Sequence, residues 1–386
     1  MTITVARTET ASTETAGAVP AVDQPDGTLK YLSVGALDLE AGGHLPDVTL
    51  AYETWGTLNA DRSNAVLIEH ALTGSTHVTR GGSDEEGWWE QLAGPGAPVD
   101  TDRFFVVSIN IVGGCYGSTG PASAAPDGKP WGSRFPLITL RDSTEAEARL
   151  ADQLGIDSWY AVIGGSMGGA RALEWAVTYP ERVRRCGVIS VGASSTAEQI
   201  AFAQAQTLAI RQDPNFQGGD YYGSAAPEAG LALARRIAHI TYRSAHELEA
   251  RFGRGAQEPE SPLQQATLGD RGRYQVESYL DHQGTKLVKR FDANSYIAIT
   301  ESLMSHDICR GRGTLQETLK DVTARFFIAA VDSDRLYFPS QSHELAEALP
   351  GEVPVHVINA PIGHDGFLTE IGQLDLEFRN AFFDQA

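Results

Sequence analysis

Short apolar runs alternate with helix-like segments through the first half of the chain. The apolar runs are rich in Val, Ile, Leu and aromatic residues and cover 48–56, 64–72, 103–112 and 159–165. Helical spacing of apolar residues follows Asp142 and resumes after Ser166, where Ala170, Leu173 and Val177 fall on one helix face. Strands that alternate with helices over this length predict a mainly parallel sheet in an α/β fold.

The pattern changes between residues 196 and 313, where helical segments rich in Ala, Gln, Arg and Glu replace the alternation. This stretch is too long for a connecting loop and predicts an inserted helical subdomain. Two later apolar runs, 324–331 and 353–360, predict two more buried strands. We therefore expect one α/β core made of residues 26–195 and 314–386.

The N-terminal segment, residues 1–25, is rich in Thr and Ala and lacks the apolar core of a signal peptide, so we expect a disordered tail. No run approaches the roughly 18 consecutive apolar residues of a membrane span, and we expect no membrane partner. With 50 acidic and 30 basic side chains, the formal charge is −20. Such a charge repels phosphate backbones, so nucleic acid is not an expected partner.

The cysteines predict neither a disulfide framework nor a metal centre. Cys115, Cys186 and Cys309 are odd in number and form no CxxC pair, which favours a reducing, cytoplasmic location. His306 and Cys309 are three residues apart without further ligands nearby, so no metal site is expected.

Ser166 lies in Gly164-Gly165-Ser166-Met167-Gly168, at the junction of a predicted strand and a predicted helix. The spacing G-x-S-x-G in this context is typical of a nucleophile elbow, in which a tight turn exposes the serine hydroxyl. A serine is a weak nucleophile, so it needs a base, an acid that orients the base, and donors for the oxyanion.

In enzymes with this elbow the acid and the histidine follow the serine in chain order, on loops after late strands. The loop after 324–331 offers Asp332 and Asp334, between which spacing does not decide. His364 follows the final predicted strand in a glycine-flanked loop and is the expected base. For the oxyanion we expect the backbone N–H groups of Met167 and, in the loop after an early strand, Leu72.

Together these segments resemble the homoserine O-acetyltransferase family of the α/β-hydrolase fold, especially its actinobacterial and mycobacterial members. The resemblance runs from about Val48 to Gly372 and rests on the motifs YETWGTLN, HALTGSTH, FVVSINIVGGCYGSTGP, GGSMGGARALEWA, LARRIAHITYRS, SDRLYFP and GHDGFL. It implies an α/β-hydrolase core with a helical lid, and ping-pong acetyl transfer from acetyl-CoA to the hydroxyl of L-homoserine in methionine biosynthesis. Acetyl-CoA would be a substrate, and no cofactor is implied.

The resemblance also implies roles for individual residues and an assembly. Its SDxL motif selects Asp334 as the triad acid. Arg235 matches the arginine that binds the substrate carboxylate, although Arg236 stands beside it, and Asp365 matches the residue that holds the amino group. Alternatively, Arg235 is a solvated helix residue and Asp365 a helix cap. The family suggests a homodimer through the helical insertion.

Two features depart from the family pattern: Tyr116 stands where Gln is common, and the polar run 254–273 matches no known motif. Three alternative activities use the same serine machinery. They are homoserine O-succinyltransferase, serine O-acyltransferase and serine esterase or hydrolase.

Overall fold

The computed structural model describes residues 26–263, 267 and 271–382, so the predicted N-terminal tail lies outside the described residues. Within them, the central sheet has eight strands, of which the first three in spatial order pair antiparallel and the others parallel. In spatial order they are β1 (Lys30–Ser33), β4 (Thr49–Trp55), β8 (Phe105–Ile109), β5 (Ala65–Glu69), β9 (Ala161–Gly165), β10 (Arg185–Ile189), β11 (Arg325–Val331) and β12 (Val355–Ile358). Two small ribbons pair β2 (Leu37–Asp38) with β3 (His44–Leu45) and β6 (Ala93–Gly94) with β7 (Val99–Asp100).

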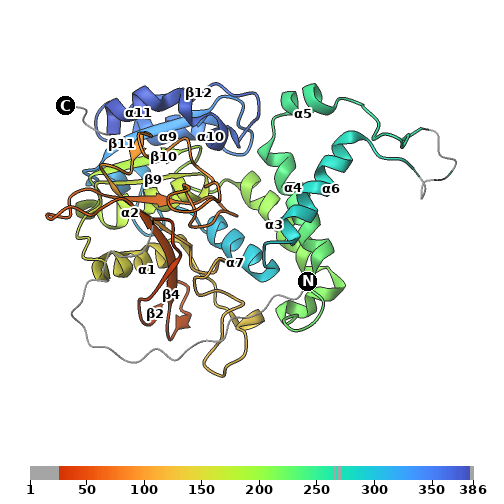
Figure 1. Ribbon diagram of the computed structural model, residues 1–386, viewed down its shortest axis with the longest axis horizontal. Helices are drawn as coiled ribbons and strands as arrows, with labels where there is room; N and C mark the ends of the chain where they lie inside the picture. Colours follow the sequence, from red (N-terminus) through yellow and green to blue (C-terminus); the bar gives the residue numbers. More distant parts are fainter. Residues whose placement is uncertain (1–25, 264–266, 268–270, 383–386) are drawn as a thin grey trace.

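Helices cover the sheet and also form a separate layer beside it (Figure 1). The helices outside residues 196–313 are α1 (Leu140–Gln153), α2 (Met167–Thr178), α8 (Leu315–Leu319), α9 (Pro339–Ala348), α10 (Gly366–Thr369) and α11 (Asp375–Phe382). Between β10 and β11 come α3 (Ala197–Arg211), α4 (Glu228–Tyr242), α5 (Ala245–Phe252), α6 (Gln275–Val288) and α7 (Ala293–Met304). Single 3-10 turns are η1 (Gly132–Arg134), η2 (Pro180–Arg182), η3 (Pro214–Gly219) and η5 (Ile371–Leu374).

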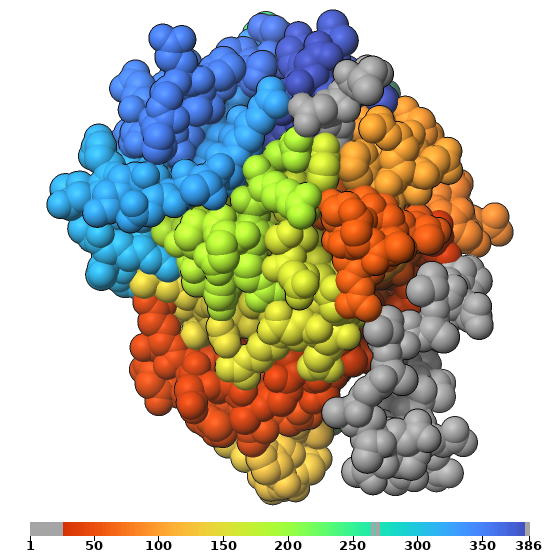
Figure 2. Space-filling view, turned by 90° about the vertical axis from the view of Figure 1, so that its left-hand side faces the viewer, coloured from red at the N-terminus to blue at the C-terminus, as the bar shows by residue number. Residues whose placement is uncertain are grey.

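Both faces of the parallel part of the sheet are buried. On β5, Leu67 packs into the core with α1 and α2, while Val66 and Ile68 pack on the opposite face with Trp89. Continuous apolar strands of this kind are typical of parallel sheets covered by helices on both sides. Figure 2 shows one face of the molecule, on which the early part of the chain (red), the middle (yellow to light green) and the C-terminal part (blue) form one continuous surface. The predicted α/β fold with a helical insertion is confirmed.

One strand prediction needs correction. The run 353–360 was expected to be a buried strand, but β12 is the last strand of the sheet and has a neighbour on one side only. Three of its four residues are therefore partly or well exposed, with Val357 at 43%, and only Ile358 is buried. An apolar run alone does not distinguish an edge strand from a central one, because its composition is the same.

The register of the parallel strands aligns their carboxyl ends. Glu69 pairs with Gly164, Gly165 with Ile189, and Val331 with Ile358. The loops that follow these strands therefore meet at one edge of the sheet, which is the edge that the helical insertion faces (Figure 1).

Candidate active site

Ser166 occupies the turn between β9 and α2 with φ 56° and ψ −128°. Positive φ is uncommon for a residue with a side chain, and the surrounding glycines make this turn possible. A Cβ on Gly164 would lie 2.2 Å from the carbonyl carbon of Gly168, and one on Gly168 would lie 2.1 Å from the carbonyl oxygen of Glu69. The backbone of Ser166 is also bonded to the end of β10, because its N–H donates to the carbonyl of Ile189 at 2.9 Å.

His364 and Asp334 form a buried pair, with 2% and 3% of their surface exposed. The ring Nδ1 of His364 lies 2.6 Å from Oδ2 of Asp334. Because a carboxylate only accepts, Nδ1 donates and Nε2 carries the lone pair in the neutral ring. Burial acts to lower the pKa of His364, but the charge and hydrogen bond of Asp334 outweigh it and raise the pKa above its ordinary value. Nε2 is buried and has no hydrogen-bond partner among the described residues.

The geometry distinguishes the two aspartates that the sequence left open. Oδ1 of Asp334 accepts the N–H groups of Leu336 and Tyr337 at 2.8 and 2.9 Å, which fixes its carboxylate towards His364. Oδ1 of Asp332 instead accepts the N–H of Ala360 at 3.0 Å and ties β11 to the loop after β12. Asp334 is therefore the carboxylate that orients His364.

A neutral histidine organises the loop that carries Leu72. Nε2 of His70 accepts the N–H of Ile111 at 3.1 Å, so Nδ1 must be the donor to the carbonyl of Ala71 at 2.8 Å. Burial and the charge of Arg171 lower the pKa of His70 to about 3, which keeps the ring uncharged. The sequence motifs assign no role to His70, although its position two residues before Leu72 is a usable signal.

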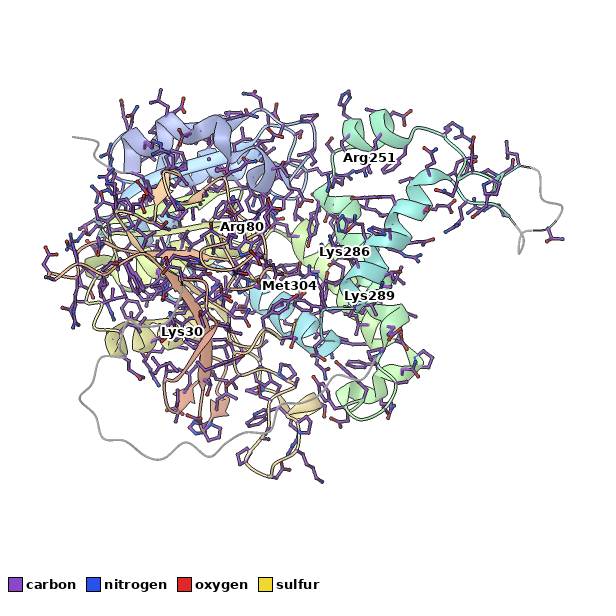
Figure 3. All side chains as sticks on the ribbon, in the orientation of Figure 1. Lys30, Arg80, Arg251, Lys286, Lys289 and Met304 are labelled. Atoms are coloured by element: carbon purple, nitrogen blue, oxygen red, sulfur yellow. The ribbon has the colours of Figure 1, made fainter. Side chains whose placement is uncertain are left out.

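Ser166 and Leu72 line one narrow pocket with the helical insertion, and its cavity volume is about 50 Å³. Met167 follows Ser166 as the first residue of α2, and its N–H is among those without an intrahelical partner. Met304 contributes from α7, and Figure 3 shows it between the insertion and the core. The other lining residues are Ser195, Gln199, Phe202, Ala203, Gln206, Thr241, Tyr242, Thr300, Leu303, Leu336 and Tyr337. Among the described residues that line the pocket, none has a charged side chain.

The two arginines on α4 point to different surroundings. Arg236 pairs with Asp281 at 2.6 Å on the surface, with 42% of its side chain exposed. Nη1 of Arg235 lies 3.4 Å from the hydroxyl of Thr73, next to Leu72, and its guanidinium lies 5.5 Å from the centre of the Tyr242 ring. The geometry therefore favours Arg235 over Arg236 as the cation near Ser166.

Asp365 lies directly after His364, at the N-terminus of α10. Its side chain makes no capping hydrogen bond there, which removes the alternative of a helix cap. Oδ2 of Asp365 lies 3.2 Å from Nη2 of Arg243. Burial raises the pKa of Asp365, and the positive charges of Arg243, His364 and Arg235 oppose the rise. Arg235 and Asp365 lie outside the lining of the apolar pocket.

Tyr242 connects these groups and was missed by sequence analysis. Its ring lies 6.0 Å from that of His364 and beneath Arg235. Arg235 and Tyr242 are seven residues apart on one helix, which is two turns and hence the same face. The seven-residue spacing of Arg235 and Tyr242 is therefore the sequence feature from which the role of Tyr242 could be predicted.

Tyr116, the departure in the glycine-rich loop, also lies at this site. Its hydroxyl contacts Arg290, whose Nη1 donates to the carbonyl of Thr73 at 2.9 Å. Arg290, in the segment between α6 and α7, therefore contacts both Tyr116 in the loop after β8 and Thr73 in the loop after β5.

The described residues of the polar run 254–273 belong to an arm between α5 and α6 that extends away from the body (Figure 1). Its described residues are held by ion pairs such as Arg273 with Asp281, at 3.1 Å. Leu263 is 85% exposed. None of the arm's described residues lines the pocket at Ser166.

A buried ion cluster supports the elbow from below. Arg171 on α2 lies 2.6 Å from Oε2 of Glu69 and also contacts Glu147, and all three side chains are fully or almost fully buried. Trp175 donates to the second oxygen of Glu147 at 2.8 Å. Arg171 thus joins α2 to β5 and α1 immediately beneath Ser166.

The described residues contain no group of three or more His, Cys, Asp or Glu side chains arranged to hold a metal ion. No helix in the described ranges is long and apolar enough to cross a membrane.

Comparison with known proteins gives both a fold and close relatives. The family model of the α/β hydrolase fold matches residues 64–370. A homoserine O-acetyltransferase of Thermobifida fusca (strain YX) is 55% identical over 358 residues, covering 91% of this chain and 93% of that protein. The crystal structure of homoserine O-acetyltransferase from Bacillus anthracis is 27% identical with a TM-score of 0.85, covering 93% of this chain and 98% of that chain. The crystal structure of esterase E22 is 26% identical with a TM-score of 0.84, covering 92% and 99%.

Proposed function

The chain belongs to the homoserine O-acetyltransferase family of the α/β hydrolase fold, and we propose that it performs the family's reaction through an acetyl-Ser166 intermediate. The reaction transfers the acetyl group of acetyl-CoA to the side-chain hydroxyl of L-homoserine, a step of methionine biosynthesis. The buried hydrogen bond between His364 and Asp334 is the observation that carries the proposed mechanism.

In the first half-reaction, Nε2 of His364 takes the proton of Ser166 while Oγ attacks the thioester carbonyl. The carbon–sulfur bond breaks, CoA leaves as the thiol with that proton, and the acetyl ester of Ser166 remains. The N–H groups of Leu72 and Met167 stabilise the oxyanion. In the second half-reaction His364 takes the proton of the homoserine hydroxyl, whose oxygen attacks the ester. Ser166 regains its proton as the acetyl group leaves.

The amino-acid substrate needs a fixed cation and a fixed anion. We assign Arg235 to its carboxylate and Asp365 to its ammonium group. Tyr242 supports this assignment because it lies between Arg235 and His364.

Transfer rather than hydrolysis requires that water be kept from the acetyl ester. The fold does not decide this, because esterase E22 has a closely similar structure. Helices α3, α4 and α7 lie over Ser166 and contribute apolar side chains to its pocket, which favours transfer. Acetyl-CoA mixed with the enzyme should release CoA rapidly only when homoserine is present, as followed with a thiol reagent. Equal release into water alone would assign the chain to the hydrolases.

The same assay checks the nucleophile. Ser166→Ala should lower kcat at least about a thousandfold, because the covalent route is lost. Undiminished turnover by this variant would contradict the mechanism.

The pocket chemistry favours acetyl over succinyl as the transferred group. A succinyl carboxylate placed there would lose water without gaining a cation, since the described lining residues are uncharged. A panel of acetyl-, propionyl- and succinyl-CoA against homoserine and serine tests donor and acceptor together. Faster transfer from succinyl-CoA would overturn the choice of donor.

We further propose a cytoplasmic homodimer that pairs through the helical insertion. Leu233 and Ile240 are 47% and 40% exposed and share the face of α4 opposite Arg235, while Ile200 and Leu208 are similarly exposed on neighbouring α3. Light scattering should give twice the mass of the chain, and Leu233→Glu with Ile240→Glu should give the monomer. Cys115, Cys186 and Cys309 are all free thiols, as suits a reducing compartment.

A further inference from the structure

The corner between α4 and α5 rests directly on the loop that carries His364. The N–H of Ser244 donates to the carbonyl of Ile362 at 3.1 Å, and its hydroxyl donates to the carbonyl of Pro361. Gly363 has φ 95°, and a Cβ there would lie 2.6 Å from the nitrogen of Ser244. Residues 242–244 and 361–365 are therefore in close backbone contact.

Arg243 sits in this corner and faces Asp365 across the contact. Nη2 of Arg243 lies 3.2 Å from Oδ2 of Asp365, and the two side chains are 15% and 19% exposed. The other nitrogen, Nη1, lies 3.7 Å from Glu247, one turn along α5. A carboxylate has two oxygens, and no hydrogen bond to Oδ1 of Asp365 comes from the described residues.

The carboxylate of Asp365 needs a fixed neighbour if it is to bind an ammonium group. Burial favours its protonated form, and Arg243 is the strongest of the charges that oppose this. The titratable and charged groups around Asp365 are Arg235 and Tyr242 on α4, Arg243 directly after it, Glu247 on α5, Tyr279 on α6, and Asp334 and His364 in the loops of the core.

We propose that Arg243 is a positioning residue for recognition of the substrate's amino group: it binds Oδ2 of Asp365 and leaves Oδ1 ionised and aimed at the ammonium. This inference rests on the proposed function, because it assigns the anion of the same amino-acid site. It adds a residue that contacts Asp365 rather than substrate.

The test compares two ligands that differ only in the amino group. Homoserine is assayed as acceptor, and 4-hydroxybutanoate, which lacks the amine, is assayed as a competitor of homoserine. In Arg243→Met the KM for homoserine should rise about tenfold, with a smaller change in kcat. The Ki of 4-hydroxybutanoate should change less than about threefold, so the ratio of Ki to KM should fall severalfold. Arg243→Lys, which keeps a cation, should recover part of the ratio.

Arg251 supplies the matched control. It contacts the same Glu247 at 3.4 Å but is 50% exposed and lies on α5 within the insertion (Figure 3). Arg251→Met should leave the ratio at the wild-type value. A second readout is pH: without Arg243 the pKa of Asp365 rises further, so homoserine binding should weaken at a higher pH than in the wild type as pH falls.

Three results would overturn the inference. One is an unchanged KM for homoserine in Arg243→Met, and another is an equal loss of affinity for both ligands, which would assign Arg243 to support of the His364 loop alone. The third is equal loss in Arg243→Lys and Arg243→Met. Failure of the proposed function has a different signature, because the wild-type enzyme would then release no additional CoA on addition of homoserine.

Discussion

The proton positions on His364 determine what the triad can do at a given pH. With Nδ1 donating to Asp334, the neutral ring presents a lone pair at Nε2, and protonation of Nε2 removes it. Burial alone would make protonation difficult, but the nearby carboxylate reverses this and raises the pKa. The base is therefore stronger than a free imidazole and is lost to protonation at a correspondingly higher pH.

The raised pKa of His364 predicts the position of the acid limb of the pH profile. Activity requires neutral His364, so kcat/KM for acetyl-CoA should fall as pH drops through a pKa above the ordinary value of about 6.5. Asp334→Asn removes the charge that raises the pKa, so its acid limb should move to lower pH. Its rate at the optimum should fall by about 10³–10⁴, because the ring is no longer held in the required tautomer. An unmoved acid limb would show that another group controls the profile.

The residues of the candidate site were only partly predictable from the sequence. Motif spacing and chain order pointed to Ser166 and His364, because the conformation of a tight turn depends on residues that are adjacent in the sequence. Asp334 could not be separated from Asp332 by spacing, since the difference is which backbone N–H groups each carboxylate accepts. Arg243 lies in the motif LARRIAHITYRS, but its role could not be predicted, because its partner Asp365 is distant in the sequence and near only after folding.

At the scale of elements, close contact of β9, α2 and the loop after β5 determines the shape of the elbow. Gly168 lies so close to Glu69 that only a hydrogen fits between the backbones. Arg171, one turn further along α2, pairs with the side chain of the same Glu69. The position of Ser166 therefore depends on contact between whole elements as well as on its own turn.

Gly168→Ala tests this contact. The added methyl group would lie 2.1 Å from the carbonyl oxygen of Glu69, so backbone must move. We expect a loss of about 2–4 kcal/mol in the free energy of unfolding and a large loss of kcat, as measured by denaturant unfolding and CoA release. The matched control is Gly372→Ala, whose Cβ would meet only the flexible end of the Gln91 side chain at 3.3 Å. If both variants unfolded alike, close packing at the elbow would not be the cause.

Most helices and strands could be predicted from the apolar pattern. The features that could not be predicted depend on which elements become neighbours after folding. The predicted helix after Ser166 matches α2, and the expected change of texture near residue 196 falls next to the start of α3 at Ala197. The edge position of β12 was not visible, because burial depends on which strands become neighbours. The burial of Arg171 was likewise hidden, because its two carboxylates come from β5 and α1.

For the whole molecule, the formal charge of −20 opposes the approach of acetyl-CoA, which is itself polyanionic. Long-range repulsion is screened by salt, with a Debye length of about 30 Å at 0.01 M and about 8 Å at 0.15 M. We therefore expect kcat/KM for acetyl-CoA to rise about twofold or more between these ionic strengths. The uncharged donor p-nitrophenyl acetate should show no such rise. A fall with salt for acetyl-CoA would indicate that local cations dominate its encounter with the enzyme.

The close contact between residues 242–244 and 361–365 joins the helical insertion to the loop that carries His364. A displacement of the insertion that separates these segments breaks the hydrogen bonds of Ser244 to Pro361 and Ile362 and the ion pair of Arg243 with Asp365. The loop thereby loses the contacts that the insertion gives it, while the hydrogen bonds of His364 to Asp334 and of Gly363 to Ser333 remain. An acetylated enzyme uncovered in this way would meet water with a less firmly positioned general base, so the opening that exposes the ester also slows its hydrolysis.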